Sequence, residues 1–263
     1  MIRVLMCGAC GRMGRLMSAG IMAAPDMEIV SAVDIIGNGH DVGVLAGGEP
    51  TGLPVKADLL SSIHTDKPDV LVDFTNPQSV MKNLRIVLPY SVPCVVGTTG
   101  FTEPELKEVG ELATQYQTAV LYAPNFALGA VLMMDFAKTA VRYFPHVEII
   151  ERHHDQKLDA PSGTALATLD LIAKERDEFV QGAANEQEKI AGARGGCFQG
   201  ARVHSVRLPG YVASQEVVFG ATGQLLTIRH DAMSRDCFLP GLLLAIRKIS
   251  QLKGLVVGLE KII

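Results

Sequence analysis

The chain has few cysteines, and their number and placement exclude a disulfide scaffold. The five, Cys7, Cys10, Cys94, Cys197 and Cys237, are an odd set scattered through 263 residues, a length that needs no covalent crosslinks for stability. Cys7 and Cys10 have the C-x-x-C spacing of redox and zinc sites, but no second Cys or Cys/His pair at metal spacing accompanies them. We therefore expect reduced thiols and no bound metal.

Basic runs and long apolar segments are also missing from the sequence. The formal net charge is −4 and no run of Lys and Arg offsets it, which argues against a nucleic-acid partner. The apolar stretch after Met1 reaches glycine within a few residues, and no later window approaches the length of a membrane span. The apolar fraction of 48% is typical of a globular core. We expect a soluble, cytoplasmic protein without a membrane partner.

In the first part of the chain, segments rich in Val, Ile and Leu alternate with helix-like segments. The expected strands cover residues 2–8, 27–34, 70–75, 93–100 and 119–125. The expected helices cover residues 12–24, 76–90 and 102–116. The last two helices begin with a capping residue, Asn76 or Thr102, and an early proline. This alternation predicts an α/β fold with a parallel, doubly wound sheet of the Rossmann type.

The pattern changes after residue 125. An expected helix (128–144) leads to a strand (147–154), a helix beginning near Ser162 and a loop over about 181–200. Three strand-like runs follow without intervening helices, at residues 202–208, 214–220 and 224–230. This order predicts a smaller α+β domain with an open mixed sheet. The helical tail is expected to pack on the first domain, so the predicted domains are 1–124 with 233–263, and 125–232.

The stretch GACGRMG, residues 8–14, lies between the first expected strand and the first expected helix. Glycines in such a turn let the backbone approach a pyrophosphate at a helix N-terminus. Here Cys10 and Met13 occupy positions at which the strict G-x-G-x-x-G pattern has glycine. Asp34 ends the next strand, where a carboxylate accepts hydrogen bonds from ribose hydroxyls. We predict a dinucleotide site; the alternative is a glycine-rich turn in an α/β fold that binds no nucleotide.

Three other segments bear on the cofactor. Residues 35–40, IIGNGH, contain no Arg or Lys to meet a 2′-phosphate, and Asp34 would repel one, so we predict that NADH is preferred, with use of NADPH left open. VGTTG (96–100) and APNF (123–126) end expected parallel strands, where ligands of such sheets collect. Their backbone groups could receive the nicotinamide carboxamide, and an ordinary turn is the equal alternative for each.

Residues 151–165, ERHHDQKLDAPSGTA, crowd two histidines, a lysine and a Pro-Ser-Gly-Thr turn into one segment. His153 and His154 would point to opposite faces of a regular strand. Lys157 and the start of the helix near Ser162 together form an anion site, because helix N-termini expose unpaired N–H groups. A proton donor beside a carboxylate receptor suits reduction of a small anionic substrate. For any one residue the alternative is a structural histidine, a solvated lysine or a simple helix cap.

Seven segments together resemble the 4-hydroxy-tetrahydrodipicolinate reductase family, also called dihydrodipicolinate reductases, of lysine and diaminopimelate biosynthesis. They are GACGRMG, DFTNP, VVGTTGF, APNFALG, EIIERHHDQKLDAPSGTA, HSVRLPGYVASQEVVFG and LTIRHDAMSRDCF. The pattern HH-x-x-K-x-DAPSGTA is far more specific to that family than the glycine motif. The resemblance implies an NAD(P)H-dependent reductase, a cyclic imine dicarboxylate as substrate, and a tetramer built by the open sheet of the second domain.

The resemblance also implies roles for single residues. His153 would be the acid/base residue and Lys157 a second proton donor, while His154, Gly163 and Thr164 would bind the substrate carboxylates. The cofactor would be held by Gly8, Ala9, Cys10, Gly11, Arg12, Met13, Asp34, Gly97, Thr98, Thr99, Ala123, Pro124, Asn125 and Phe126.

This sequence departs from the family pattern at a few positions. Cys10 replaces a frequent glycine and is expected to tighten the first turn. Ile35 and Asn76 replace arginines that recognise a 2′-phosphate in some members, and Ser214 replaces a common histidine. Two alternative functions remain at this point: another two-domain nicotinamide oxidoreductase, such as an amino-acid or sugar dehydrogenase, and a non-catalytic dinucleotide sensor.

Overall fold

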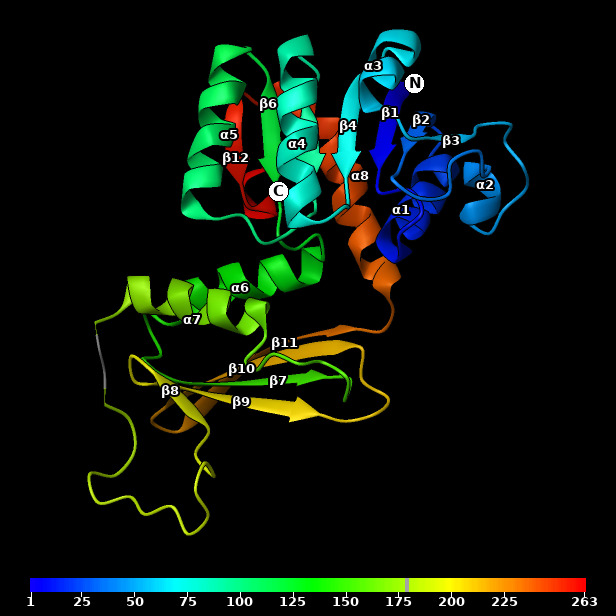
Figure 1. Ribbon diagram of the computed structural model, residues 1–263. Helices are drawn as coiled ribbons and strands as arrows, with labels where there is room; N and C mark the ends of the chain where they lie inside the picture. The colour runs from blue at the N-terminus through cyan, green and yellow to red at the C-terminus, as the bar shows by residue number, and fades with distance from the viewer. Residues whose placement is uncertain (178–179) are drawn as a thin grey trace. The chain divides into compact units, whose positions relative to one another are not determined.

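The computed structural model describes residues 1–177 and 180–263 and divides them into two compact units (Figure 1). The first unit comprises residues 1–126 and 238–263, and the second comprises residues 127–237. The α/β fold class predicted from the sequence is confirmed, because one unit contains a parallel sheet with helices and the other a mixed sheet with helices.

The first unit is built on a seven-stranded sheet in which every strand pair is parallel. Its order is β12-β6-β5-β4-β1-β2-β3. The strands are β1 (Ile2–Cys7), β2 (Met27–Val33), β3 (Val55–Lys56), β4 (Val70–Asp73), β5 (Cys94–Val96), β6 (Ala119–Tyr122) and β12 (Gly254–Val257). Strand order turns back beside β1, which is the switch point at which doubly wound sheets bind ligands.

Helices cover both faces of this sheet, as parallel sheets require. One face packs on α3 (Leu59–Asp66), α4 (Pro77–Val87) and α5 (Glu103–Gln115), whose apolar residues share a core with β1, β4, β5 and β6. The other face carries α1 (Arg12–Ala23) and the C-terminal α8 (Leu239–Lys248), which contact each other. The C-terminal tail therefore packs within the first unit. The short α2 (Val42–Leu45) follows β2.

The second unit contains a five-stranded sheet in the order β11-β10-β7-β9-β8. Only the β7–β9 pair is parallel, so the sheet is mixed, as predicted. The strands are β7 (His146–His153), β8 (Gly196–Phe198), β9 (Ala201–Arg207), β10 (Ala213–Ala221) and β11 (Gln224–Ala232). The register places His153 opposite Arg207 and Glu151 opposite Gln215.

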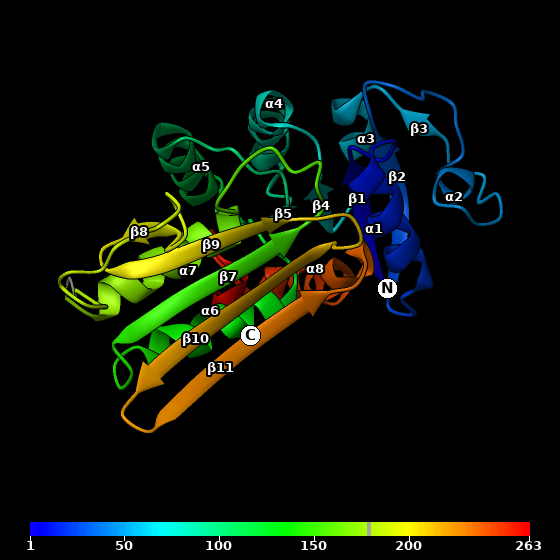
Figure 2. The same ribbon diagram turned by 90° about the horizontal axis from the view of Figure 1, so that it is seen from below.

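Two helices, α6 (Leu128–Ala140) and α7 (Gly163–Glu175), lie on the same side of this mixed sheet (Figures 1 and 2). Alternate residues of β7 point toward them, so Val147 and Ile149 join the core formed with Leu169, Ile172 and their neighbours. The same alternation puts Glu151 and His153 on the helix-covered side. Glu151 and His153 therefore form a polar pair at the end of a strand face whose preceding residues are apolar.

The structure adds elements that the sequence pattern did not predict. The strands β3, β8 and β12 are two to four residues long, too short for periodicity to reveal. Of these, β8 lies inside the segment expected to be a loop, and β12 extends the parallel sheet beside β6. Short 3₁₀ segments follow α4 (Leu88–Tyr90), precede and follow α8 (Arg235–Phe238, Ile249–Gln251), and occur near the C-terminus (Leu259–Lys261).

Candidate active site

The predicted cofactor residues lie at the carboxyl ends of strands in the first unit. Residues 8–13 follow β1, Asp34 follows β2, residues 97–99 follow β5, and residues 123–126 follow β6. Parallel strands present these ends at the same edge of the sheet, so the structure gathers all four segments there. The side chains of Ala9, Ala123 and Phe126 are nearly fully buried, so contact with a ligand would come mainly from their backbone.

The glycine turn is held in shape by contacts that leave no room for side chains. Gly8 has a φ of +82°, and a Cβ atom there would lie 2.4 Å from the Phe74 carbonyl oxygen. A Cβ atom at Gly14 would lie 1.9 Å from the Gly8 carbonyl oxygen. Positions 8 and 14 therefore need glycine. The strict pattern shares the first glycine, at position 8, but continues with glycine at positions 10 and 13. The helix α1 begins at Arg12, and no side chain among the described residues caps it, which suits an anion at its N-terminus.

Cys10 fits the turn because its side chain points toward the segment after Asp34. Its Sγ lies 3.2 Å from the Ile36 carbonyl oxygen, and a Cβ atom at Gly37 would lie 2.5 Å from this sulfur. The crowding expected from Cys10 is thus relieved by Gly37. The Cys10 N–H donates to Asp34 Oδ2 at 2.8 Å, so the carboxylate is oriented by the turn itself. Burial, followed by the nearby Asp34 charge, raises the pKa of the Cys10 thiol.

A cavity of about 680 Å³ opens beside this turn. Gly8, Gly11 and Asp34 line it together with the apolar side chains of Ile35 and Ile36, which are 85% and 61% exposed. Its volume and mainly apolar walls suit the adenosine part of a dinucleotide. The residues present therefore fit the cofactor that the sequence predicted.

Asp73 ties the two loops after β4 and β5 together. This fully buried residue accepts hydrogen bonds from the hydroxyls of Thr75 and Thr98, each at 2.7 Å, and from Asn83 Nδ2 at 2.8 Å. The Thr98 side chain therefore has a structural role, because its hydrogen bond to Asp73 positions the Gly97–Thr99 loop. Phe74 packs against Gly97, where a Cβ atom would lie 2.2 Å from the ring.

A substitution of Gly14 tests this turn. Gly14→Ala is expected to lower the free energy of unfolding by about 2 kcal/mol or more, because its methyl group would overlap the Gly8 backbone. It should also weaken NADH binding. Gly163→Ala is the matched control at the start of α7, since its Cβ position has no described atom within 4 Å apart from its chain neighbours and the backbone of its own helix turn. Chemical denaturation of both variants checks this, and equal stabilities would contradict the packing role of Gly14.

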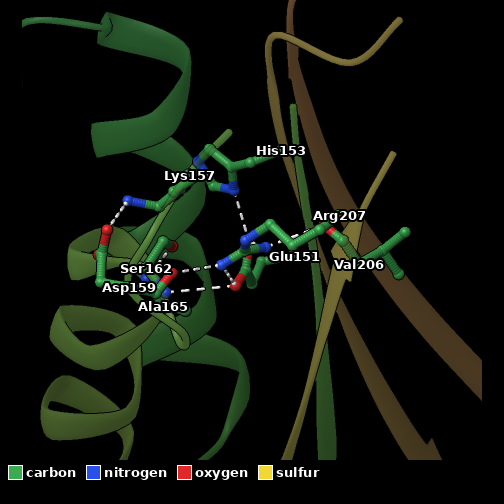
Figure 3. Close-up of polar contacts among 8 residues, drawn as sticks. All are labelled: Glu151, His153, Lys157, Asp159, Ser162, Ala165, Val206 and Arg207. Atoms are coloured by element: carbon green, nitrogen blue, oxygen red, sulfur yellow. Dashed lines mark hydrogen bonds and ion pairs between the residues drawn. The ribbon is translucent and has the colours of Figure 1, made fainter. Parts of the chain in front are cut away.

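In the second unit, the strand β7 brings Glu151 and His153 to the start of α7 (Figure 3). Glu151 is fully buried, and its Oε2 lies 2.5 Å from His153 Nδ1. Arg207, from the end of β9, donates to both oxygens of Glu151 at 2.8 and 2.9 Å. The Ser162 N–H donates to Glu151 Oε1 at 3.2 Å. One buried carboxylate therefore joins two strands and the turn that begins α7.

The charge of Glu151 is stabilised by these contacts. Burial by itself raises the pKa of Glu151, but hydrogen bonds from His153 and Arg207 outweigh burial and lower the pKa to about 2. The carboxylate is therefore ionised at neutral pH. His153 lies beside it with a side chain that is 16% exposed, so the ring is held from one side and remains open to solvent on another.

Lys157 and α7 form the other part of this region. Lys157 Nζ donates to Asp159 Oδ1 at 2.6 Å, and this contact lowers the pKa of the Asp159 carboxyl. Ser162 caps α7 by accepting a hydrogen bond from the Ala165 N–H at 3.2 Å. Gly163 and Thr164 are therefore the first two residues of the helix, where the helix dipole favours an anion.

His154 lies just beyond the end of β7. Within the described residues its ring has no hydrogen-bond partner, which leaves it available to a ligand, while its carbonyl accepts from the Lys157 N–H at 3.2 Å. The five residues predicted for catalysis and substrate binding thus lie on one continuous segment, which runs from the last residue of β7 to the second residue of α7. Sequence reasoning missed Glu151 and Arg207; the spacing of Glu151, two residues before His153 in a strand, was the available signal.

Residues 1–177 and 180–263 contain no group of three or more His, Cys, Asp and Glu side chains arranged to hold a metal ion. Within the same residues, none of the helices has the length and apolar character needed to cross a bilayer.

Comparisons with known proteins agree with this geometry. Residues 2–126 match the family model of the dihydrodipicolinate reductase N-terminus, and residues 129–263 match that of its C-terminus. A 4-hydroxy-tetrahydrodipicolinate reductase of Desulfitobacterium hafniense is 52% identical over 98% of this chain and 97% of its own length. One from Moorella thermoacetica is 52% identical over 100% of this chain and 98% of its own.

A solved structure is similar over the whole length. The dipicolinate-bound dihydrodipicolinate reductase from Paenisporosarcina sp. TG-14 has a TM-score of 0.91 and 45% sequence identity, with 100% of both chains covered. Both family models, these relatives and this structure agree on one family. The chain belongs to the dihydrodipicolinate reductase family.

Proposed function

We propose that this chain reduces 4-hydroxy-tetrahydrodipicolinate, the cyclic imine dicarboxylate of lysine and diaminopimelate biosynthesis, to tetrahydrodipicolinate. The observation that carries the proposal is the segment from His153 to Thr164, which contains two histidines, a lysine and the N-terminus of α7. The family match over nearly the whole chain supports it. When bound, the nicotinamide cofactor supplies the hydride.

Residues of this segment are assigned the proton transfer that accompanies hydride addition. The net reaction takes up one hydride and one proton, and the 4-hydroxyl group leaves as water. We assign His153 as the acid/base residue that supplies the proton, because its ring is oriented by a buried carboxylate and still reaches solvent. Lys157 is assigned as a second proton donor. Its present partner Asp159 is 64% exposed. Lys157 can therefore leave Asp159 and bind a substrate carboxylate instead.

The substrate carboxylates are assigned to His154, Gly163 and Thr164. Gly163 and Thr164 begin α7, where the helix dipole favours negative charge. Lys157 adds a full positive charge to this region, and His154 contributes a ring without a competing partner among the described residues. The dipicolinate bound by the Paenisporosarcina relative is a dicarboxylate, which supports a receptor of this kind.

We infer that NADH is the preferred cofactor. Among the described residues that line the cavity beside the glycine turn, Asp34 and Asp58 are acidic and Lys82 is basic. This balance disfavours the extra charge of a 2′-phosphate. Asn76, which stands where some family members have arginine, lines the cavity while its side chain accepts from the Ser79 N–H at 3.0 Å to cap α4.

Lys82 lines the cavity although no local sequence pattern indicates it, and it provides a test of cofactor choice. Lys82→Met is expected to lower kcat/KM with NADPH about fivefold and to leave NADH nearly unchanged, since one partly solvated charge contact is worth about 1 kcal/mol. Arg85→Met, on the same helix but paired with Glu108, is the control for loss of a positive charge. A higher kcat/KM with NADPH than with NADH in the unmodified chain would contradict the preference.

We further propose that the chain forms a homotetramer in the cytoplasm, in line with its family resemblance. Both described helices of the second unit lie on one side of the mixed sheet. The other side carries Arg152, Glu216 and Arg229, with Glu216 Oε2 at 3.3 Å from Arg152 Nη2 and 3.6 Å from Arg229 Nη1. This pairing neutralises charges on the face that the helices leave uncovered, which suits contact with a second copy. Sedimentation equilibrium tests it, and a stable monomer at assay concentrations would contradict it.

The assay of the proposed function uses the substrate produced freshly by the preceding synthase. Purified chain should oxidise NADH only when this synthase and its substrates are present. An amino-acid or sugar dehydrogenase would instead act on amino acids or polyols, and a sensor would bind NADH without turnover. Either of those results would contradict the proposal.

A further inference from the structure

We propose that Glu151 and Arg207 are positioning residues that set the tautomer and the proton affinity of His153. The inference deepens the proposed function, because it rests on His153 as the proton-supplying residue. Neither residue is assigned above to proton transfer, to the substrate or to the cofactor. Glu151 of β7 contacts the His153 ring directly, and Arg207, from the end of β9 that pairs with β7, contacts Glu151 (Figure 3).

Glu151 determines the tautomer of the neutral His153 ring, that is, which of its two nitrogens is protonated. An ionised carboxylate can only accept hydrogen bonds, and Glu151 Oε2 lies 2.5 Å from His153 Nδ1. Nδ1 must therefore be the protonated nitrogen of the neutral ring. Nε2 is left as the atom that exchanges a proton with a ligand, and the ring cannot rotate without breaking the contact with a fully buried partner.

Arg207 balances the charge of Glu151. A buried carboxylate alone would hold the imidazolium form tightly and slow the release of its proton. Arg207 donates to both Glu151 oxygens through a bidentate contact, and its guanidinium also donates to the carbonyls of Val206 and Asp159. The guanidinium is thereby fixed from three directions. The pair is electrically neutral, so it orients His153 while leaving the proton free to transfer.

Other charged groups around His153 are few and already paired. The loop after β7 contributes Lys157 with its partner Asp159, and β7 and β9 contribute Glu151 and Arg207. On the neighbouring strand β10, the residue in register is Ala213, and the inward-facing Gln215 is uncharged and donates to Thr168 Oγ1 at 2.8 Å. Among the described residues, Glu151 and Arg207 are therefore the charges whose removal changes the proton affinity of His153 most directly.

The two residues have opposite charges, so their removal should have opposite effects on the pH profile of kcat. Glu151→Gln should shift the limb that reports the His153 proton to lower pH, because the imidazolium loses its anionic partner. It should also lower kcat by at least about tenfold, since the wrong tautomer becomes accessible. Arg207→Met should shift the same limb to higher pH, because the unbalanced carboxylate holds the proton more tightly.

The chain offers a matched control on the opposite face of the same strands. Glu148 of β7 lies 2.8 Å from His204 Nε2 of β9 and pairs with Arg194 at 2.8 Å, which reproduces the Glu–His–Arg grouping away from the proposed site. Glu148→Gln should leave the pH profile of kcat unchanged, because its His204 partner is remote from His153. Circular dichroism and thermal unfolding of each variant report whether the second unit, which carries the three substitutions, remains folded.

A readout independent of turnover is the ¹⁵N chemical shift of the His153 ring in the full-length chain. At neutral pH the unmodified ring should be protonated at Nδ1, and Glu151→Gln should lose this preference. If Glu151→Gln fails to fold, Arg207→Met and the ring shifts of the unmodified chain still decide the matter. Proton at Nε2 in the unmodified chain, or pH limbs that move together or not at all, would overturn the inference. Full activity of His153→Gln would remove the assignment of His153 as the acid/base residue, whereas the proposed function itself would fail if the unmodified chain showed no synthase-dependent NADH oxidation.

Discussion

Replacing His153 with Gln is expected to lower kcat by about 10²-fold or more, because a positioned acid/base residue contributes roughly 10² to 10⁴ to a rate. Gln keeps a polar group near Glu151 but cannot supply a proton. The dissociation constant for NADH should stay unchanged, since the predicted cofactor residues all lie in the first unit. Steady-state kinetics with synthase-generated substrate, together with NADH titration, measure both quantities.

His154→Gln is the matched control for this substitution. It alters the adjacent histidine, whose assigned role is to bind a substrate carboxylate, so KM should rise while kcat changes much less. If His154→Gln lost kcat and His153→Gln mainly raised KM, the two histidines would have to exchange roles. Unchanged kinetics in both variants would contradict the site altogether.

Lys157→Met is expected to lower kcat by about 10²-fold or more, with an increase in KM, because the side chain is assigned both a proton and a charge. The partner variant Lys157→Arg separates these two contributions. Arginine keeps the positive charge that attracts carboxylates but does not release its proton at neutral pH. Lys157→Arg should therefore restore KM largely and kcat poorly. Full recovery of kcat would show that the lysine serves only as a charge.

Much of the fold could be predicted because its local signals agree with its tertiary structure. Thr102 and Ser162 cap helices in the positions that their sequences indicate. Strand β7 alternates buried and less buried residues, as a strand with one covered face requires. The glycine turn was recognised despite its irregular spacing, and the structure shows why that spacing works: positions 8 and 14 are the ones that approach other backbone atoms.

Other features depend on contacts between distant parts of the chain. Arg207 reaches Glu151 only because β9 pairs with β7 in one particular register, and no local pattern reveals that pairing. Lys82 lines the cavity beside Asp34 through the packing of α4 on the sheet, so a search of the residues following Asp34 could not find it. The short strand β12 is recognisable only beside β6, where its four residues complete the sheet.

The most direct test is a crystal structure of this chain with NADH and dipicolinate as a dicarboxylate analogue. We predict that one carboxylate lies at the start of α7 near Gly163 and Thr164, that Lys157 has left Asp159 to meet the ligand, and that His153 Nε2 faces the ring while Nδ1 keeps its contact with Glu151. A dicarboxylate bound away from α7, or a His153 ring turned so that Nδ1 faces the ligand, would contradict the account.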